Sequence, residues 1–199
     1  MKDVMSVKLV ILGLLMEGNK HPYEIQQTIN ERQMKHYIKL ASGSLYYAFD
    51  TLEKNQLVKV VDVIRETNRP EKTVYSITDA GKEEFERLYF EQLLKKEHMH
   101  RPVYAALSFT SYVDQEKVAS ALEKKIEETA AYLEKMQNLY QVKKVDHSIA
   151  NLSIIMRTIM HLKVELTWFT HLLEAAKSNK LTEVDDGYFE DVEKIVDEF

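Results

Sequence analysis

The chain has 199 residues, of which 45% are hydrophobic and 30% are charged, and it contains five glycines, three prolines and no cysteine. This composition is typical of a soluble, mostly helical protein with one large domain or two small ones. The absence of cysteine excludes disulfides, thiolate metal sites and thiol catalysis, and it fits a reducing compartment. The formal net charge is −5. Residues 1–97 carry 15 acidic and 15 basic residues, so the acidity belongs to residues 98–199.

The sequence shows no segment that would direct it to a membrane. The apolar run at residues 9–15 is interrupted by Gly13, and no small-residue cleavage site follows it. A helix that spans a bilayer needs roughly 18–20 apolar residues, and no run approaches that length. We therefore expect a cytoplasmic protein without a membrane partner.

The first part of the chain predicts two helices. Residues 9–16 are apolar on most sides, which favours a buried helix, and Gly18 and Asn19 are typical of its end. Pro22 suits the first turn of a second helix, which we expect to run to about Lys35.

Residues 42–55 predict a third helix with a narrow buried stripe. Leu45, Phe49 and Leu52 are spaced at i, i+4 and i+7 and lie on one face. The Ser and Tyr residues near its start lie mostly off that face. Such a helix is suited to insertion into a DNA groove.

A two-stranded ribbon is expected next. Residues 57–65 mix charged residues with five Val or Ile, residues 68–70 form a turn, and residues 73–77 return. Thr78 is a suitable N-cap for a fourth helix. The order of three helices, two strands and a helix is that of a winged helix-turn-helix domain.

A basic stripe at residues 32–39 precedes the third helix and contains three Lys or Arg and one His without an acid. A local positive field of this kind favours nucleic acid even when the total charge is negative. A solvated helix end explains the same residues equally well.

The C-terminal half is predicted to be entirely helical. Residues 98–102 mark a boundary between domains at 1–97 and 98–199, and a short helix follows at 103–112. Asp114 is expected to cap a long helix, and a second long helix is expected at 149–176. The fold class is therefore mainly α, with a winged helix and its two-stranded wing at the N-terminus and an all-α C-terminal dimerisation domain. The acidic tail, residues 185–199, has the spacing of one more helix.

Apolar residues on both long helices alternate at spacings of three and four, as in a coiled coil. The two helices can pack on each other as an antiparallel hairpin. The last helix also carries a second apolar stripe, which favours a homodimer because a second partner is then needed. The residues predicted for dimerisation are Leu152, Ile155, Ile159, Leu162, Leu166, Phe169 and Leu173. The second stripe consists of Ile149, Met156, Met160, Val164, Trp168 and Leu172.

The sequence shows none of the common catalytic motifs: no glycine-rich phosphate loop, no nucleophile elbow and no His-Glu-x-x-His. We therefore expect neither an enzyme nor a cofactor. His98 and His100 could ligate a metal, but no clear third ligand is nearby, so no metal site is expected. Arg101 with His98 could instead hold a carboxylate ligand.

Three segments of the N-terminal half carry a family resemblance: HPYEI at 21–25, SGSLYYAFDTLEKNQLV at 42–58 and RPEKTVYSITDAGKEEFERL at 69–88. They resemble the phenolic-acid-decarboxylase-regulator (PadR) family of bacterial transcription factors. The run at 161–175 is similar to the larger C-terminal domain in one branch of that family. Asn55-Gln56 replaces the family's usual Glu-Gly and removes its left-handed glycine, a conformation that asparagine can adopt at some cost.

The resemblance implies a dimeric, sequence-specific DNA-binding regulator, most often a repressor released by a small molecule; an activator fits the sequence as well. The residues it places on double-stranded DNA are Lys39, Ser42, Ser44, Tyr46, Tyr47, Arg65, Asn68, Arg69 and Lys72. Met156, Met160 and Trp168 are candidates for an aromatic effector pocket, although such a stripe is more often core. Tyr46 could also be a core aromatic, and Arg69 and Lys72 could be plain solvated charges. The alternative function is a helical dimeric protein-interaction module that keeps the winged helix and has lost DNA binding.

Overall fold

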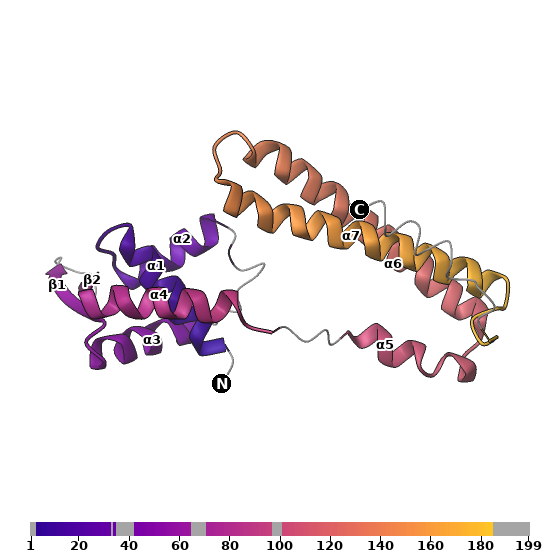
Figure 1. Cartoon of the computed structure of the whole chain (residues 1–199), viewed down its shortest axis with the longest axis horizontal. Coiled ribbons are helices and arrows are strands. Elements are labelled where there is room, and N and C mark those ends of the chain that lie inside the picture. Colours follow the sequence, from indigo (N-terminus) through magenta and orange to yellow (C-terminus); the bar gives the residue numbers. More distant parts are fainter. Residues whose placement is uncertain (1–2, 33, 35–41, 65–70, 97–100, 185–199) are drawn as a thin grey trace. The chain divides into compact units, whose positions relative to one another are not determined.

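The structure, a computed structural model, describes residues 3–32, 34, 42–64, 71–96 and 101–184 (Figure 1). Its contacts divide the chain into two compact units, residues 1–98 and 99–199. The boundary predicted from the sequence differs from this division by one residue. Each unit has its own hydrophobic core.

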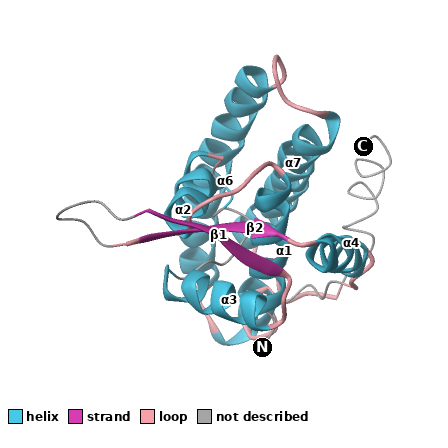
Figure 2. Ribbon diagram, turned by 90° about the vertical axis from the view of Figure 1, so that its left-hand side faces the viewer, coloured by secondary structure: helices cyan, strands magenta, loops and turns pink. Residues whose placement is uncertain are grey.

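The N-terminal unit consists of three helices, a β-ribbon and a fourth helix, and Figure 2 shows the two strands leaving the helices as a ribbon. Its elements are α1 (Asp3–Met16), α2 (Pro22–Glu31), α3 (Ser42–Lys54), β1 (Val58–Ile64), β2 (Lys72–Ile77) and α4 (Asp79–Leu93). This order confirms the predicted winged helix-turn-helix fold.

The core of this unit is built around α1, which is buried on most sides as its sequence predicts. Ile11 and Leu12 are completely inaccessible to solvent, and they belong to one apolar cluster with residues of α2, α3, the strands and α4. α1 stops where Gly18 adopts a φ of 141°, a conformation that side-chain-bearing residues rarely take. The predicted end of the first helix is therefore confirmed.

The second helix begins at Pro22 as predicted and ends at Glu31, four residues before the expected Lys35. His21 caps it: the Nδ1 atom of His21 accepts a hydrogen bond from the backbone N–H of Tyr23 at 3.0 Å. The His21 N–H in turn donates to the Glu24 carboxylate at 2.7 Å, which completes a capping box. The pKa of His21 is lowered, first by burial, and a neutral imidazole is the form that can accept this hydrogen bond.

The wing is an antiparallel ribbon in which Val58 pairs with Ile77 and Ile64 pairs with Lys72. A bulge interrupts the register between Val60 and Asp62.

The C-terminal unit consists of α5 (Pro102–Leu107), the 3-10 turn η2 (Thr110–Tyr112), α6 (Gln115–Lys143) and α7 (Ile149–Lys177). Asp114 accepts a hydrogen bond from the Glu116 N–H at 2.8 Å, so the predicted N-cap of α6 is confirmed. A short turn joins α6 to α7, and the two 29-residue helices lie side by side as a hairpin (Figure 1). The helix expected over 103–112 is shorter and ends at Leu107.

Within the described ranges, no helix combines the length and the apolar character needed to cross a membrane. The predicted tail helix at 185–199 lies outside the described residues.

Candidate nucleic-acid interface

The third helix has one buried face and one face open to solvent. Leu45, Phe49 and Leu52 are at most 1% exposed and lie in the core, as their spacing predicts. Tyr46 and Tyr47 point away from that core, and 51% and 66% of their surfaces are exposed. The alternative that Tyr46 is a core aromatic is therefore wrong.

The C-terminal end of α3 is closed by a hydrogen-bond pattern that fixes where β1 starts. The N–H of Leu57 donates to the Leu52 carbonyl at 2.9 Å, and the N–H of Gln56 donates to the Glu53 carbonyl at 2.8 Å. This is a Schellman motif, whose left-handed position is usually glycine. That position is occupied by Gln56, with a φ of 58°, and not by Asn55.

Thr78 ties the end of α3 to the start of α4. Its hydroxyl donates to the carbonyls of Gln56 and Leu57 at 2.8 and 3.0 Å and accepts from the Gly81 N–H at 3.0 Å. The prediction of Thr78 as an N-cap is confirmed. A side chain at position 81 would collide with this junction, because an added Cβ would lie 2.0 Å from the Leu57 oxygen. The Thr-x-x-Gly spacing thus holds α3 and the wing in one arrangement.

Tyr75 joins the wing to the helices. Its ring packs on Phe49 with ring centroids 4.8 Å apart, and its hydroxyl lies 3.5 Å from the Glu53 carboxylate. Burial, followed by the nearby charge of Glu53, raises the pKa of Tyr75, so this hydroxyl is protonated at neutral pH. The backbone of Tyr75 also exchanges two hydrogen bonds with Lys20, which anchors β2 to the turn before α2.

The predicted DNA-contacting residues are only partly described. Ser42 is the first residue of α3, Ser44 and Lys72 are half-buried, and Tyr46 and Tyr47 are exposed. The others lie outside the described residues: Lys39, Arg65, Asn68 and Arg69. The described sites therefore gather on α3, with Lys72 at the start of β2.

Arg32 is the one basic residue of the stripe at 32–39 that the structure describes, and it forms an ion pair within the N-terminal unit. Its guanidinium binds the Glu17 carboxylate through two hydrogen bonds of 2.6 and 2.7 Å, which join the ends of α1 and α2. The hydrogen bond to Arg32 lowers the pKa of Glu17. Arg32 is therefore committed to an ion pair inside the domain.

In the C-terminal unit, the apolar seam of α7 faces α6 of the same chain. Ile159, Leu162 and Phe169 are at most 6% exposed. Ile159 and Leu162 pack with Met136 of α6, while Phe169 packs with Ala119 and Leu122. The seam predicted for dimerisation thus lies in the hairpin core: Ile155 and Leu173 border the same clusters, and Leu152 and Leu166 are half-buried. The reason is that consecutive helices joined by a short turn pack as an antiparallel pair, and their two apolar seams then bury each other.

The second apolar stripe of α7 is divided into two halves. Trp168 and Leu172 lie in the core cluster beside α5, where Tyr104 meets the Trp168 ring edge-on at a centroid distance of 6.0 Å. Met156, Met160 and Val164 instead expose 37%, 45% and 40% of their surfaces.

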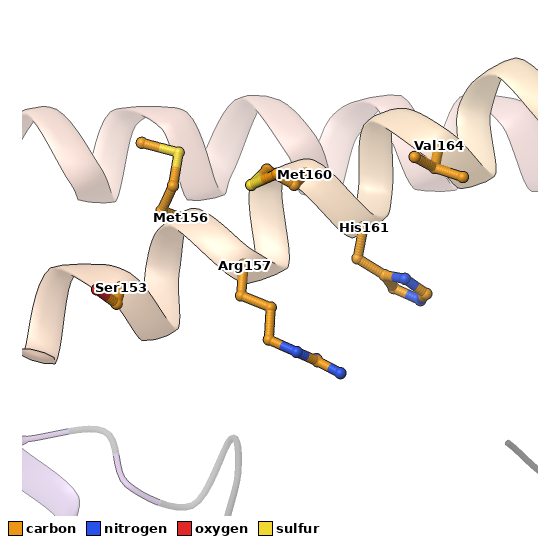
Figure 3. Close-up of a pocket in the computed structure, with 6 residues that line it drawn as sticks. All are labelled: Ser153, Met156, Arg157, Met160, His161 and Val164. Atoms are coloured by element: carbon orange, nitrogen blue, oxygen red, sulfur yellow. The ribbon is translucent and has the colours of Figure 1, made fainter. Parts of the chain in front are cut away.

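The exposed half of this stripe borders a shallow hollow on α7. Figure 3 shows Met156, Met160 and Val164 along its length, with Arg157 and His161 projecting from the same helix. Two of the three residues predicted for an effector pocket line this hollow, whereas Trp168 does not.

Arg101 is the N-cap residue of α5 and binds two side chains of α7, Glu165 and His161. A carboxylate ligand at Arg101 would therefore compete with Glu165. His98 and His100 lie outside the described residues, and among the described residues no group of three potential ligands could hold a metal ion.

Two features of this site were missed from the sequence. The cap on α2 is a histidine, and only the Glu three residues later, the usual partner in a capping box, could have indicated it. The second is a role for Asp50: its spacing predicts a position off the buried face of α3, where it is indeed exposed, but it was not counted among the DNA-contacting residues.

Together, the exposed tyrosine face, the fixed wing and the helical C-terminal unit define a winged-helix DNA-binding protein. Residues 11–87 match the profile of the "Transcriptional regulator PadR-like family". This match assigns the N-terminal unit of the chain to the PadR-like family of transcriptional regulators.

Solved structures with the same fold extend the likeness to both units. Bacillus subtilis PadR in complex with operator DNA is 18% identical, with a TM-score of 0.74 over 86% of this chain and 99% of that chain. The same regulator with p-coumaric acid is 17% identical and has a TM-score of 0.71 over 86% and 98%. A PadR-like regulator from Bacillus cereus is 22% identical and has a TM-score of 0.65 over 87% and 99%. A search of curated proteins gave no significant match.

Proposed function

We propose that this protein is a cytoplasmic, homodimeric repressor that binds double-stranded DNA and releases it when a small aromatic molecule binds. The exposed face of α3 carries this proposal. It presents Tyr46 and Tyr47 to solvent, while Gln56 and Thr78 hold the helix at a fixed angle to the wing. The exposed tyrosine rings do not contribute to the hydrophobic core, whereas their hydroxyls can form hydrogen bonds with phosphates and base edges.

The DNA contacts proposed beyond the two tyrosines follow the winged-helix arrangement. Ser42 and Ser44 belong to the start of α3, and Lys39 would lie on the flanking phosphates. Arg65, Asn68, Arg69 and Lys72 would reach the minor groove or its backbone from the wing. Two α3 helices of a dimer would read half-sites one helical turn, about 34–36 Å, apart or a multiple of it.

Two observations support a dimer and an effector. The exposed half of the α7 stripe, Met156, Met160 and Val164, is an apolar surface that a second copy would cover. This replaces the inner seam as the proposed dimer surface. The adjoining hollow combines two thioethers with Arg157 and His161, a lining that suits a small aromatic molecule. The B. subtilis PadR structures with operator DNA and with p-coumaric acid show that this fold accepts both classes of ligand.

Selection of bound DNA from a random pool tests the proposal. The full-length protein is expected to enrich a defined sequence and to bind it with strong salt dependence, since phosphate contacts release counterions. Tyr47→Phe removes one hydroxyl, and a lost hydrogen bond of about 1 kcal/mol would weaken binding roughly fivefold. Tyr89→Phe is the matched control, because Tyr89 is a 48% exposed tyrosine on α4.

The protein-interaction alternative keeps one observation in its favour, because Arg32 is occupied by Glu17. It predicts no enriched sequence and no difference between the two Tyr→Phe variants. The absence of an enriched sequence would exclude the regulator proposal, whereas equal binding by the two variants would exclude only the contact of the Tyr47 hydroxyl with DNA.

A further inference from the structure

The solvent face of α3 carries an acid between its two tyrosines and the end of the helix. Asp50 is exposed, and it follows Tyr46 by four residues and Tyr47 by three, so the three side chains share one face. Within the part of the chain that the structure describes, the Asp50 carboxylate makes no hydrogen bond and no ion pair. Glu53, by contrast, is used by the fold, since it accepts from Tyr75.

A carboxylate on a DNA-facing helix is costly unless DNA itself offers it a donor. It approaches a row of phosphates of the same charge, and an ionised carboxylate can only accept hydrogen bonds. In the major groove, guanine and thymine present acceptors at their O6, N7 and O4 atoms, which repel it. Adenine presents an N6 amino group, but its N7 acceptor lies beside that group and repels a carboxylate. Cytosine presents the N4 amino group without a neighbouring acceptor, and this group is the usual partner of Asp and Glu side chains.

We propose that Asp50 is a specificity-determining residue whose carboxylate accepts a hydrogen bond from the N4 amino group of a cytosine in each half-site. Its charge also weakens binding to every sequence that lacks this donor. The inference rests on the proposed DNA-binding function and deepens it by naming one base of the operator.

The helix geometry restricts where this cytosine lies. With a rise of 1.5 Å per residue, Asp50 stands about 4.5 Å beyond Tyr47 and about 6 Å beyond Tyr46 along the helix axis. Base pairs are stacked at intervals of about 3.4 Å. The cytosine is therefore expected one or two base pairs from the bases nearest the tyrosines, at symmetry-related positions of the operator.

The test is random-pool selection with the full-length wild-type protein, Asp50→Asn and Glu86→Gln. Glu86 is an exposed acid of α4, so its variant removes the same charge from the same unit at a distance from α3. The wild type and Glu86→Gln are expected to share one profile, including the cytosine. In Asp50→Asn, the cytosine preference should fall about tenfold and move toward adenine, which asparagine recognises. Circular dichroism verifies that each variant is folded.

Each other outcome overturns the inference in a distinguishable way. If Asp50→Asn tightens binding to all sequences while keeping the wild-type profile, Asp50 only repels DNA and reads no base. A profile that Asp50→Asn leaves unchanged without tighter binding gives the residue no role. If the wild type enriches no sequence, the proposed function itself fails, and the inference fails with it.

Discussion

Replacing Gly81 by alanine tests whether the junction at Thr78 positions both α3 and the wing. The added Cβ would lie 2.0 Å from the Leu57 carbonyl oxygen and 2.7 Å from Cγ1 of Ile77. The Leu57 oxygen would need to withdraw by at least 1 Å, because real Cβ contacts are essentially never shorter than 3.0 Å. That oxygen is held by two donors of Thr78, its N–H at 3.1 Å and its hydroxyl at 3.0 Å.

The cost follows from what the movement breaks. Two hydrogen bonds are worth about 1 kcal/mol each, and a distorted N-cap costs about 1 kcal/mol more. Alanine recovers up to about 1 kcal/mol through its higher helix propensity. We therefore expect Gly81→Ala to destabilise the N-terminal unit by about 2–4 kcal/mol, counting the strain that remains.

Gly13→Ala is the matched control, since it makes the same change in α1. There the new Cβ would lie 3.1 Å from an edge atom of the Phe85 ring, a side chain that can turn aside. The gain in helix propensity offsets this contact, so its stability should stay within about 1 kcal/mol of the wild type.

Hydrogen exchange during urea titration measures both variants by region. Peptides from the wing and α4 should lose protection in Gly81→Ala and keep it in Gly13→Ala. Trp168, the single tryptophan, lies in the C-terminal unit. Its fluorescence reports the unfolding of that unit, which neither substitution should change, and is therefore the internal reference. Unfolding free energies of the two variants that agree within about 0.5 kcal/mol would show that the contact of position 81 with the Leu57 oxygen does not restrict the junction.

Three further predictions concern caps and charges. Gln56→Gly should raise the unfolding free energy by about 0.5–1 kcal/mol in urea titrations, because it relieves the left-handed backbone, whereas Gln56→Ala should not. The lowered pKa of His21 means that its cap contributes fully above pH 6.5 and is lost as the pH falls through the depressed value; His21→Asn should abolish that part of the pH dependence of stability. The pKa of Glu17 is also lowered, so its bond to Arg32 likewise stabilises the fold at higher pH. This contribution to stability is complete above about pH 4.5 and is lost as the carboxylate protonates. Arg32→Gln should therefore reduce the melting temperature slightly at pH 7, in low salt, and not at pH 3, because both partners are largely exposed.

Much of the fold could be predicted because its signals are local. Apolar spacing located the three helices of the winged domain, and Thr78 and Asp114 were recognisable as N-caps from residue type and position alone. The β-branched residues at 57–65 and 73–77, with a turn between them, predicted the wing. The physical reason for Gly81 required coordinates, because the Leu57 oxygen that excludes a side chain is 24 residues away.

The role of the C-terminal stripes could not be predicted in the same way. A heptad pattern predicts that one face of a helix is buried, but it does not predict which helix covers that face. Ile159 and Phe169 were assigned to a second copy, yet they are covered by α6 of their own chain. The exposure of Met156 and Met160 could be recognised only from the structure, in which the inner seam of α7 packs against α6.

Sedimentation of the protein on its selected DNA duplex shows whether it binds as a symmetric dimer. A dimeric regulator will place two chains on each duplex, on an inverted repeat whose half-sites are separated by whole helical turns, so that each α3 faces a major groove. A complex of one chain per duplex, on a site without two-fold symmetry, would contradict this arrangement.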